Sequence, residues 1–305
     1  MNLFTISQLS RFSGIKPHTI RIWEQRYDAL KPNRSEGNTR YYDDLQLRRL
    51  LNIVSLMDAG FKISELGGMS DKKIFSLLEQ RQKKDHYTEG EEFYISQLIG
   101  AGMSYDEQHF EKIFSHCLLR FGLKDSYIHV LYPMLVRIGL LWASDTIPPA
   151  QEHFISNMIR QKLFTAIDSL PPAAPGAESW LLFLPEDEWH EIGLLFANYM
   201  IRLSGKKSVY LGSNIPFDSL RQAIKDIKPD KLLLFLVSQH YTEKKQQLHD
   251  ALRTLFPVKN IYLAGSMHLA DTIEIGKMNW LQTPDDLDRV LQSVVVEEKR
   301  KIVKH

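Results

Sequence analysis

The last two fifths of the chain alternate short apolar runs with helical patterns, and this alternation constrains the fold more than any other feature. The runs fall at residues 180–184, 208–211, 231–237 and 260–264. Parallel strands need long crossover connections, which are usually helices that cover the sheet. The pattern therefore predicts a doubly wound α/β domain with a parallel sheet over residues 178–305.

Composition limits the class of protein. The chain has 305 residues, 44% hydrophobic and 25% charged, which is typical of a folded chain of two or three domains. A single cysteine, Cys117, excludes an internal disulfide framework. No apolar stretch approaches the roughly 20 residues of a membrane helix, and residues 1–10 lack the apolar core of a secretion signal. We expect a cytoplasmic protein without a membrane partner.

Charge is distributed unevenly along the chain. Residues 1–85 hold 15 Lys or Arg against 10 Asp or Glu, whereas the remainder is slightly acidic. A basic segment favours binding to nucleic acid, because neutralising phosphates releases counterions. A solvated lysine-rich surface would give the same count.

The composition also suggests domain boundaries. We predict an N-terminal domain over residues 1–78, a charged linker over 79–92 and a helical domain over 93–170. A proline-rich connector at residues 171–176 precedes the α/β domain.

The N-terminal segment predicts a helix-turn-helix. A helix pattern over residues 5–12 is followed by a turn at 13–15, and Pro17 suits the first position of a helix that continues over residues 18–27. The inward positions of that second helix hold Ile20, Trp23 and Tyr27. The opposite face holds His18, Arg21, Ile22 and Gln25. That face combines a cation, hydrogen-bonding groups and one apolar contact, as reading the major groove requires.

Residues 31–42 predict a β-hairpin that turns at Gly37-Asn38. Its arms carry Arg34, Arg40 and Tyr41, which are residue types that bind phosphate. Taken alone, the tyrosines could equally pack on the helix, and Trp23 suits a helical core.

Together, these segments resemble the winged-helix DNA-binding domain of MerR-type transcriptional regulators over about 70 residues. The resemblance implies an all-α winged helix-turn-helix head in which Arg21 reads bases while Arg34, Arg40 and Tyr41 contact phosphates. Lys16 stands where the family usually has a small hydroxyl residue, so we expect the second helix to lack that side-chain cap.

The loop after the first predicted strand holds Glu188, His190 and Gly193. Loops at the carboxyl ends of parallel strands form the ligand crevice. Glu188 is close enough in sequence to orient the imidazole of His190 as a metal ligand. Gly193 would let a bulky ring approach the backbone. A surface histidine with no ligand is the alternative.

This loop resembles the cobalamin-binding signature of methionine synthase and corrinoid proteins, on a Rossmann-like (flavodoxin-like) fold. The resemblance implies that His190 is the lower cobalt ligand, and that Ser238 and Gly265 line the slot for the nucleotide tail. Three positions differ from the usual pattern: Glu188 replaces aspartate, His240 an apolar residue and Ala264 a glycine.

The middle segment, with Trp142 followed by Glu152-His153, resembles the four-helix cap of CarH and LitR-type photoreceptor repressors. The resemblance implies that Trp142, Glu152 and His153 contact the upper ligand of cobalamin. Ala143 stands where the best-known members have a second cobalt-binding histidine, and alanine has no donor atom. A plain bundle with Trp142 in its core is the alternative.

The sequence thus favours a cobalamin-binding, light-responsive MerR-type repressor that is not an enzyme. We expect adenosylcobalamin as the cofactor, with methylcobalamin as the alternative, a double-stranded DNA operator as partner, and a homodimer or homotetramer. Two other functions stay open. One is a regulator whose cobalamin-like domain works without cofactor, by oligomerisation or partner binding. The other is a corrinoid-dependent methyl carrier subunit, which the basic head disfavours.

Overall fold

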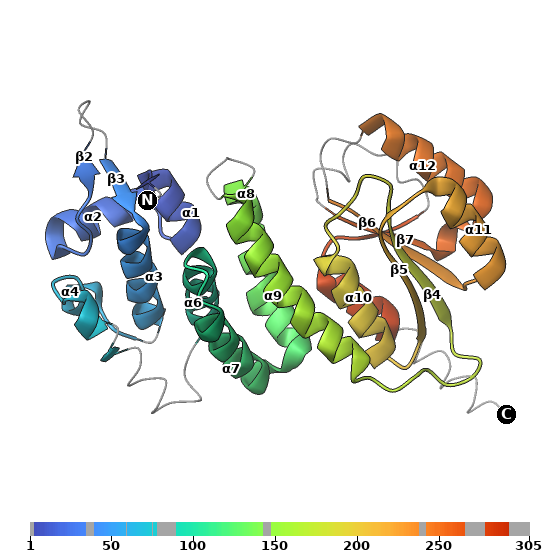
Figure 1. Ribbon diagram of the computed structural model, residues 1–305, viewed down its shortest axis with the longest axis horizontal. Helices are drawn as coiled ribbons and strands as arrows, with labels where there is room; N and C mark the ends of the chain where they lie inside the picture. Colours follow the sequence, from blue (N-terminus) through green and yellow to red (C-terminus); the bar gives the residue numbers. More distant parts are fainter. Residues whose placement is uncertain are drawn as a thin grey trace. The chain divides into compact units, whose positions relative to one another are not determined.

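The computed structural model describes residues 3–34, 40–58, 60–74, 76–77, 90–142, 148–237, 242–265 and 278–292. The chain divides into two compact units, Met1–Met158 and Ile159–His305. The first is helical apart from a small sheet, and the second contains the large sheet (Figure 1). None of the helices in the described ranges is long and apolar enough to cross a membrane.

The head begins with the predicted helix-turn-helix, formed by α1 (Ile6–Ser13) and α2 (Pro17–Tyr27). Thr5 caps α1: its hydroxyl accepts from the Gln8 N–H at 3.3 Å, and the Gln8 side chain accepts from the Thr5 N–H. Gly14 ends α1 with a φ of 72°, a left-handed conformation that glycine adopts without strain. Lys16 gives α2 no side-chain cap, as predicted.

The predicted hairpin is present as β2 (Asn33–Arg34) and β3 (Arg40–Asp43), which pair antiparallel. An unpredicted strand, β1 (Leu3–Phe4), pairs with the other edge of β3. The head is therefore helical with a three-stranded sheet. The turn predicted at Gly37-Asn38 lies outside the described residues.

Helix α3 (Asp44–Asp58) and the short α4 (Ile63–Leu66) complete the head. The bundle that follows consists of α6 (Glu91–Met103), α7 (Glu107–Ser126), a π-helical turn η1 (Tyr127–Leu131), α8 (Tyr132–Trp142) and α9 (Pro149–Asp168). Most of the predicted linker lies outside the described residues, and its last two residues belong to α6. Helix α3 packs on α6 and α1 on α8, so the head and the bundle share one core (Figure 1).

A buried amide joins α3 to the bundle. Gln97 of α6, only 5% exposed, donates from Nε2 to Asn52 at 3.2 Å and to Ser55 at 3.0 Å. Its amide oxygen lies 3.0 Å from Nε2 of His109 in α7. Because that oxygen can only accept, His109 donates from Nε2. The packing between head and bundle thus includes a network of hydrogen bonds whose donors and acceptors are defined.

This network predicts a pH dependence of stability. Burial lowers the pKa of His109, with Lys112 and Arg48 acting in the same direction and Asp106 against it. As pH falls below the ordinary value of about 6.5, the unfolded chain therefore binds a proton before the folded chain does. We expect the unfolding temperature of the first unit to be highest above that pH and to fall below it.

Scanning calorimetry from about pH 7.5 to about pH 5, in the wild type and in His109→Gln, measures this dependence. The variant should lose the part of the slope that comes from His109. Equal slopes in the two proteins would contradict the assignment.

The second unit contains a five-stranded parallel sheet, as predicted. Its strands are β4 (Ser179–Pro185), β5 (Lys207–Ile215), β6 (Lys231–Leu236), β7 (Ile261–Gly265) and β8 (Asn279–Leu281), in the order β5-β4-β6-β7-β8. The helices include α10 (Ile192–Leu203), α11 (Phe217–Ile227) and α12 (Thr242–Leu255), and residues 284–292 are also helical. A short 3-10 turn, η2 (Val258–Asn260), precedes β7.

The three inner strands β4, β6 and β7 are largely buried, and helices lie on both faces of the sheet (Figure 1). Apolar residues of α11 and α12 form one cluster with alternate residues of β4, β6 and β7, whereas α10 packs on the other face. This explains why the strands are continuous apolar runs rather than alternating ones. The four predicted strands are confirmed, and β8 is an additional strand at the edge.

Candidate functional site

The strand order gives the sheet a topological switch point. The chain leaves β4 to one side for β5 and returns on the other side as β6, which pairs with β4. In this order the switch point lies between the first and third strands, and ligands bind there beyond the carboxyl ends. The loop at residues 186–191 follows β4 and therefore lies at the switch point.

Glu188 is the anchor of this loop. Its side chain is buried, and Oε2 accepts from the Val237 N–H at 2.9 Å, directly after β6. Its Oε1 accepts from the N–H groups of Trp189 at 3.1 Å and His190 at 3.3 Å. A buried carboxylate is costly unless it is hydrogen-bonded, and these donors supply the bonds. The carboxylate thereby holds the loop against the end of β6.

The imidazole of His190 is oriented by the same carboxylate. Its Nδ1 lies 2.6 Å from Oε1 of Glu188, while the side chain as a whole is 51% exposed. Metal-binding histidines commonly donate one ring N–H to a carboxylate, which leaves the other nitrogen to act as the ligand. An imidazole oriented in this way has the chemistry to bind a metal ion such as the cobalt of a corrin.

Asn214 ties the loop to the neighbouring strand. It lies in β5, accepts from the Asp187 N–H at 2.9 Å and donates its own N–H to the Glu188 carbonyl at 3.1 Å. The sequence analysis did not identify this residue. The one feature that marks this residue is its left-handed backbone conformation, with a φ of 57°. That conformation is known only from the structure.

The residue after the histidine is held as well. Oε1 of Glu191 forms an ion pair with Nε of Arg160 in α9 at 3.2 Å, and its Oε2 accepts from the Tyr210 hydroxyl at 3.1 Å. Burial and the adjacent carboxylate raise the pKa of Tyr210, so its hydroxyl stays protonated as the donor. These three residues were also missed, because nothing in the sequence links positions 160, 191 and 210.

Gly193 has a packing role in the folded unit. A Cβ added to it would lie 2.7 Å from the ring of Phe235 in β6. The glycine therefore allows α10 to approach the sheet closely. The bulky ring expected beside it is supplied here by the chain's own Phe235.

Gly265 ends β7 at the same edge of the sheet, opposite Leu236. A Cβ there would lie 2.0 Å from the Leu236 carbonyl oxygen, so the close strand approach requires glycine. Ala264 is buried beside it. Ser238 and His240 lie outside the described residues.

The predicted cap residues lie on α8 and α9, in the first unit. Trp142 is the last residue of α8, and its side chain and all of Ala143 lie outside the described part. Glu152, in the first turn of α9, accepts from the Ser156 hydroxyl at 2.5 Å. Nδ1 of His153 lies 3.2 Å from the second Glu152 oxygen, and the His153 side chain is 70% exposed.

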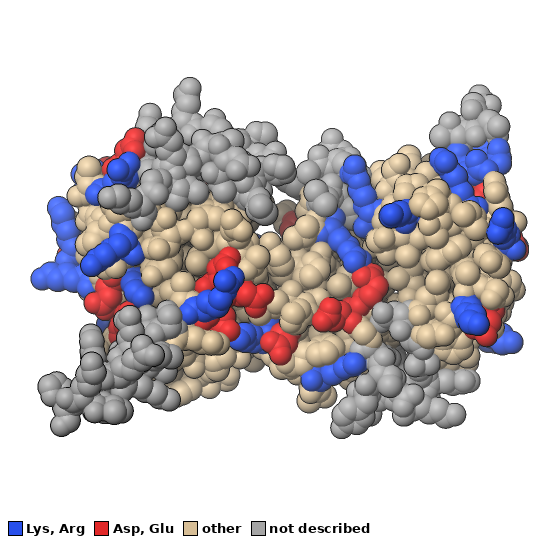
Figure 2. All heavy atoms as spheres, turned by 180° about the vertical axis from the view of Figure 1, so that it is seen from behind, with Lys and Arg blue, Asp and Glu red and all other residues tan. Residues whose placement is uncertain are grey.

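The head presents the outward face that was predicted. His18, Arg21, Ile22 and Gln25 are all exposed on α2. On the opposite side Ile20 and Trp23 are buried and Tyr27 is partly buried. Lys and Arg side chains gather on the head in Figure 2, at the right of the view. The core residues of α2 therefore lie on the opposite side of the helix from the four residues that were predicted to face DNA.

The wing is attached to α2 by Glu24, a residue that the sequence analysis did not single out. One Glu24 oxygen accepts from Nε of Arg40 at 3.0 Å, and the other accepts from the Tyr42 hydroxyl at 3.0 Å. Arg40 and Tyr41 are partly exposed, and Arg34 is exposed. Because Arg40 is paired within the head, its guanidinium has a fixed direction.

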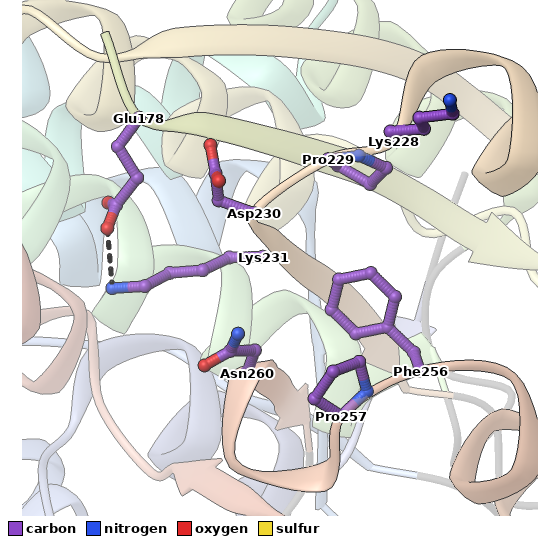
Figure 3. A pocket seen from close by; sticks show the side chains of 8 residues that line it. All are labelled: Glu178, Lys228, Pro229, Asp230, Lys231, Phe256, Pro257 and Asn260. Carbon is purple, nitrogen blue, oxygen red and sulfur yellow. Dashed lines mark ion pairs between the residues drawn. The ribbon is translucent and has the colours of Figure 1, made fainter.

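A separate hollow lies at the amino ends of the strands, opposite the His190 edge (Figure 3). Three of its charged side chains, those of Glu178, Asp230 and Lys231, are engaged within the protein. Glu178 lies 3.1 Å from the Lys231 ammonium, and Asp230 accepts from the N–H and hydroxyl of Ser179. We assign no ligand to it.

Two family models match the chain. Residues 4–73 match the model described as MerR HTH family regulatory protein, and residues 94–166 match the one described as B12 binding domain. The chain therefore combines a head that matches MerR-type regulatory proteins with a segment that matches a B12 binding domain, and its curated relatives are transcriptional regulators.

Individual relatives agree with this class. The chain is 27% identical to the HTH-type transcriptional repressor CarH of Myxococcus xanthus, over 83% of this chain and 85% of CarH. It is 28% identical to the repressor CarA of the same organism, over 89% and 90% of the two chains. Among solved structures, the monomethylamine corrinoid protein of Methanosarcina barkeri aligns with a TM-score of 0.54 at 16% identity. That alignment covers 67% of this chain and all of the other, and it shows a shared fold.

Proposed function

We propose that this regulator is a light-responsive repressor whose assembly and operator affinity depend on a bound cobalamin. The observation that carries the proposal is the His190 imidazole, held by a buried Glu188 at the switch point of the sheet, in a chain that also presents an exposed recognition helix. Similarity to CarH and CarA, both named as repressors, supports the direction of regulation.

Each predicted residue has a role in this proposal. His190 would hold the cobalt of the cofactor, and Glu188 orients its imidazole. The upper ligand is contacted by Trp142, Glu152 and His153, and the tail slot is lined by Ser238 and Gly265, with Gly193 allowing close packing. When bound, adenosylcobalamin, or alternatively methylcobalamin, supplies a cobalt–carbon bond that visible light can break.

The head acts by bringing several copies of α2 to DNA at once. In the dark, the cofactor-bound protomers pair as a homodimer or homotetramer. The N-terminal domains, residues 1–78, are joined to the rest of the chain by the linker 79–92, and in the cytoplasm they then occupy repeated half-sites of the operator. Because the assembly raises the effective concentration of the heads at the DNA, binding is strengthened. After illumination the assembly dissociates.

The step after illumination differs from that of the photoreceptors that the sequence resembles. Ala143 offers no donor atom for cobalt, so a second histidine ligand cannot come from that position. His153 is an exposed alternative on the neighbouring helix.

The direct test is cofactor uptake and assembly. Apoprotein incubated with adenosylcobalamin in the dark should elute from gel filtration with a corrinoid spectrum and at a larger size than the illuminated sample. A protein peak without the corrinoid spectrum would overturn the proposal.

A second candidate is a regulator that uses its cobalamin-like domain without cofactor. It is favoured by Phe235, whose ring occupies the space beside Gly193, and by the departures at His240 and Ala264. It predicts a single assembly state in the presence and absence of cobalamin.

Replacement of Arg40 by alanine tests the wing. Loss of one phosphate contact should weaken binding to all DNA sequences and lower the slope of log affinity against log salt by about one. Electrophoretic mobility shifts of the DNA upstream of the coding sequence, at several salt concentrations, measure the slope.

Glu24→Gln is the matched control for Arg40→Ala, because it removes the intramolecular ion pair and keeps the guanidinium. Its slope should stay at or above the wild-type value. Equal losses in both variants would show that Arg40 only supports the fold of the head.

A further inference from the structure

Glu191, directly after His190, is held by two side chains of the second unit. Its Oε1 lies 3.2 Å from Nε of Arg160 in α9, and its Oε2 accepts from the Tyr210 hydroxyl of β5 at 3.1 Å. We propose that Arg160, Glu191 and Tyr210 form a brace that positions His190 for cobalt and ties its loop to α9. This inference rests on the proposed function.

The ion pair of the brace is partly buried. The Arg160 and Glu191 side chains are only 31% and 19% exposed, so water screens their ion pair less than it would an exposed pair. Glu191 is also the residue before the first turn of α10, and its carbonyl accepts from the Leu195 N–H at 2.8 Å. Its position therefore fixes where α10 starts.

His190 is consequently held from both sides. Before it, Glu188 is bound to the end of β6, and after it, Glu191 is bound to β5 and α9. A ligand atom has to be held to within about 0.5 Å for productive geometry, and such precision comes from supporting contacts. Loss of one support should let the imidazole vary in position without unfolding the sheet.

Helix α9 carries both Arg160 of the brace and one of the residues predicted to contact the upper ligand. Glu152, Ser156 and Arg160 follow one another at intervals of four residues, so they share one face of the helix. Glu152 accepts from Ser156, and Arg160 holds Glu191. One helix thus carries a predicted contact of the upper ligand and the support of the lower ligand. A displacement of the His190 loop would be transmitted to α9 through Arg160.

Arg160→Met, which keeps an unbranched side chain and removes the charge, is the test variant. We expect about tenfold weaker cobalamin binding, as is typical when a residue that orients a metal ligand is lost. We also expect a lower fraction of bound cobalt(II) cofactor whose paramagnetic resonance lines are split by a histidine nitrogen. Arg160→Lys should restore part of that fraction.

Arg202→Met is the matched control. Arg202 lies near the other end of α10, and its side chain donates to the Leu170 carbonyl at 3.3 Å, so it contacts the segment after α9 without touching the His190 loop. Affinity and nitrogen splitting should equal those of the wild type. A loss of the same size in both arginine variants would show that any contact to α10 has this effect, and would overturn the brace.

Hydrogen exchange of the apoprotein separates this inference from the proposed function. In Arg160→Met the amides of residues 186–193 should exchange faster than in the wild type, with or without cofactor. Unchanged exchange and unchanged nitrogen splitting would overturn the brace in a protein that binds cobalamin. If the wild type takes up no cobalamin, the proposed function fails, and unchanged exchange alone would then overturn the brace.

Discussion

Replacement of His190 by alanine is expected to abolish retention of cobalamin. In the proposed function the imidazole is the cobalt ligand, and its removal would leave only contacts to the corrin and the nucleotide tail. Loss of a residue that merely orients a ligand costs about 10- to 100-fold in affinity, so loss of the ligand itself should cost more. The measurement is the corrinoid absorbance of the protein peak after gel filtration in the dark.

Loss of the residue that orients His190 should weaken cobalamin binding less than loss of His190 itself. Glu188→Gln keeps a group that can accept from the Val237 N–H but removes the charge that Nδ1 of His190 contacts. We expect its affinity to lie between that of the wild type and that of His190→Ala, about 10- to 100-fold below the wild type.

His129→Ala is the matched control for His190→Ala. The His129 side chain is 51% exposed, the same as that of His190, and it lies in the bundle near Glu91. His129→Ala should take up cobalamin as the wild type does, and neither variant should change the unfolding temperature by more than a surface substitution does. Wild-type uptake by His190→Ala would show that the lower ligand is assigned wrongly.

Replacement of Gly265 by alanine is expected to destabilise the second unit strongly. The added Cβ would lie 2.0 Å from the Leu236 carbonyl oxygen, so β6 and β7 would have to separate at their paired ends. Overpacking against backbone costs about 3 kcal/mol, near the upper end of the usual range. For a domain of this size that lowers the unfolding temperature by roughly 10 °C, which scanning calorimetry can resolve.

Gly139→Ala is the corresponding control. Gly139 lies in α8 with nothing within 4 Å of the added Cβ. Alanine there should be neutral or should stabilise the helix by up to about 1 kcal/mol.

Gly265→Ala also separates two roles of that position. If the unfolding temperature stayed at the wild-type value while cobalamin uptake fell, the glycine would serve the tail slot rather than the pairing of the strands. Parallel losses of stability and uptake would be explained by the strand contact alone.

The head and the parallel sheet could be predicted because their signals are local and periodic. Pro17, the inward Ile20 and Trp23 and the apolar runs of the four predicted strands each determine a local structure. The strands β1 and β8 were missed because two or three residues cannot show a period of two.

The tertiary contacts were beyond sequence reasoning for a different reason. Glu188 and His190 are two residues apart, so their interaction could be proposed from spacing. Arg160 and Glu191, or Gln97 and Ser55, are distant in sequence, and each of these residue types is common on exposed helix faces. Their pairing depends on how helices pack, which periodicity does not specify.

The ion pair between α9 and the residue after His190 also affects how such proteins can be recombined. The proline-rich segment at residues 171–176 is largely exposed and is the obvious place to join a foreign vitamin-sensing sheet. A graft there would leave Arg160 with the host and replace Glu191 by whatever the donor carries. Hybrid regulators joined at that segment would respond poorly unless the donor brings a carboxylate to the same place or α9 is transplanted with it.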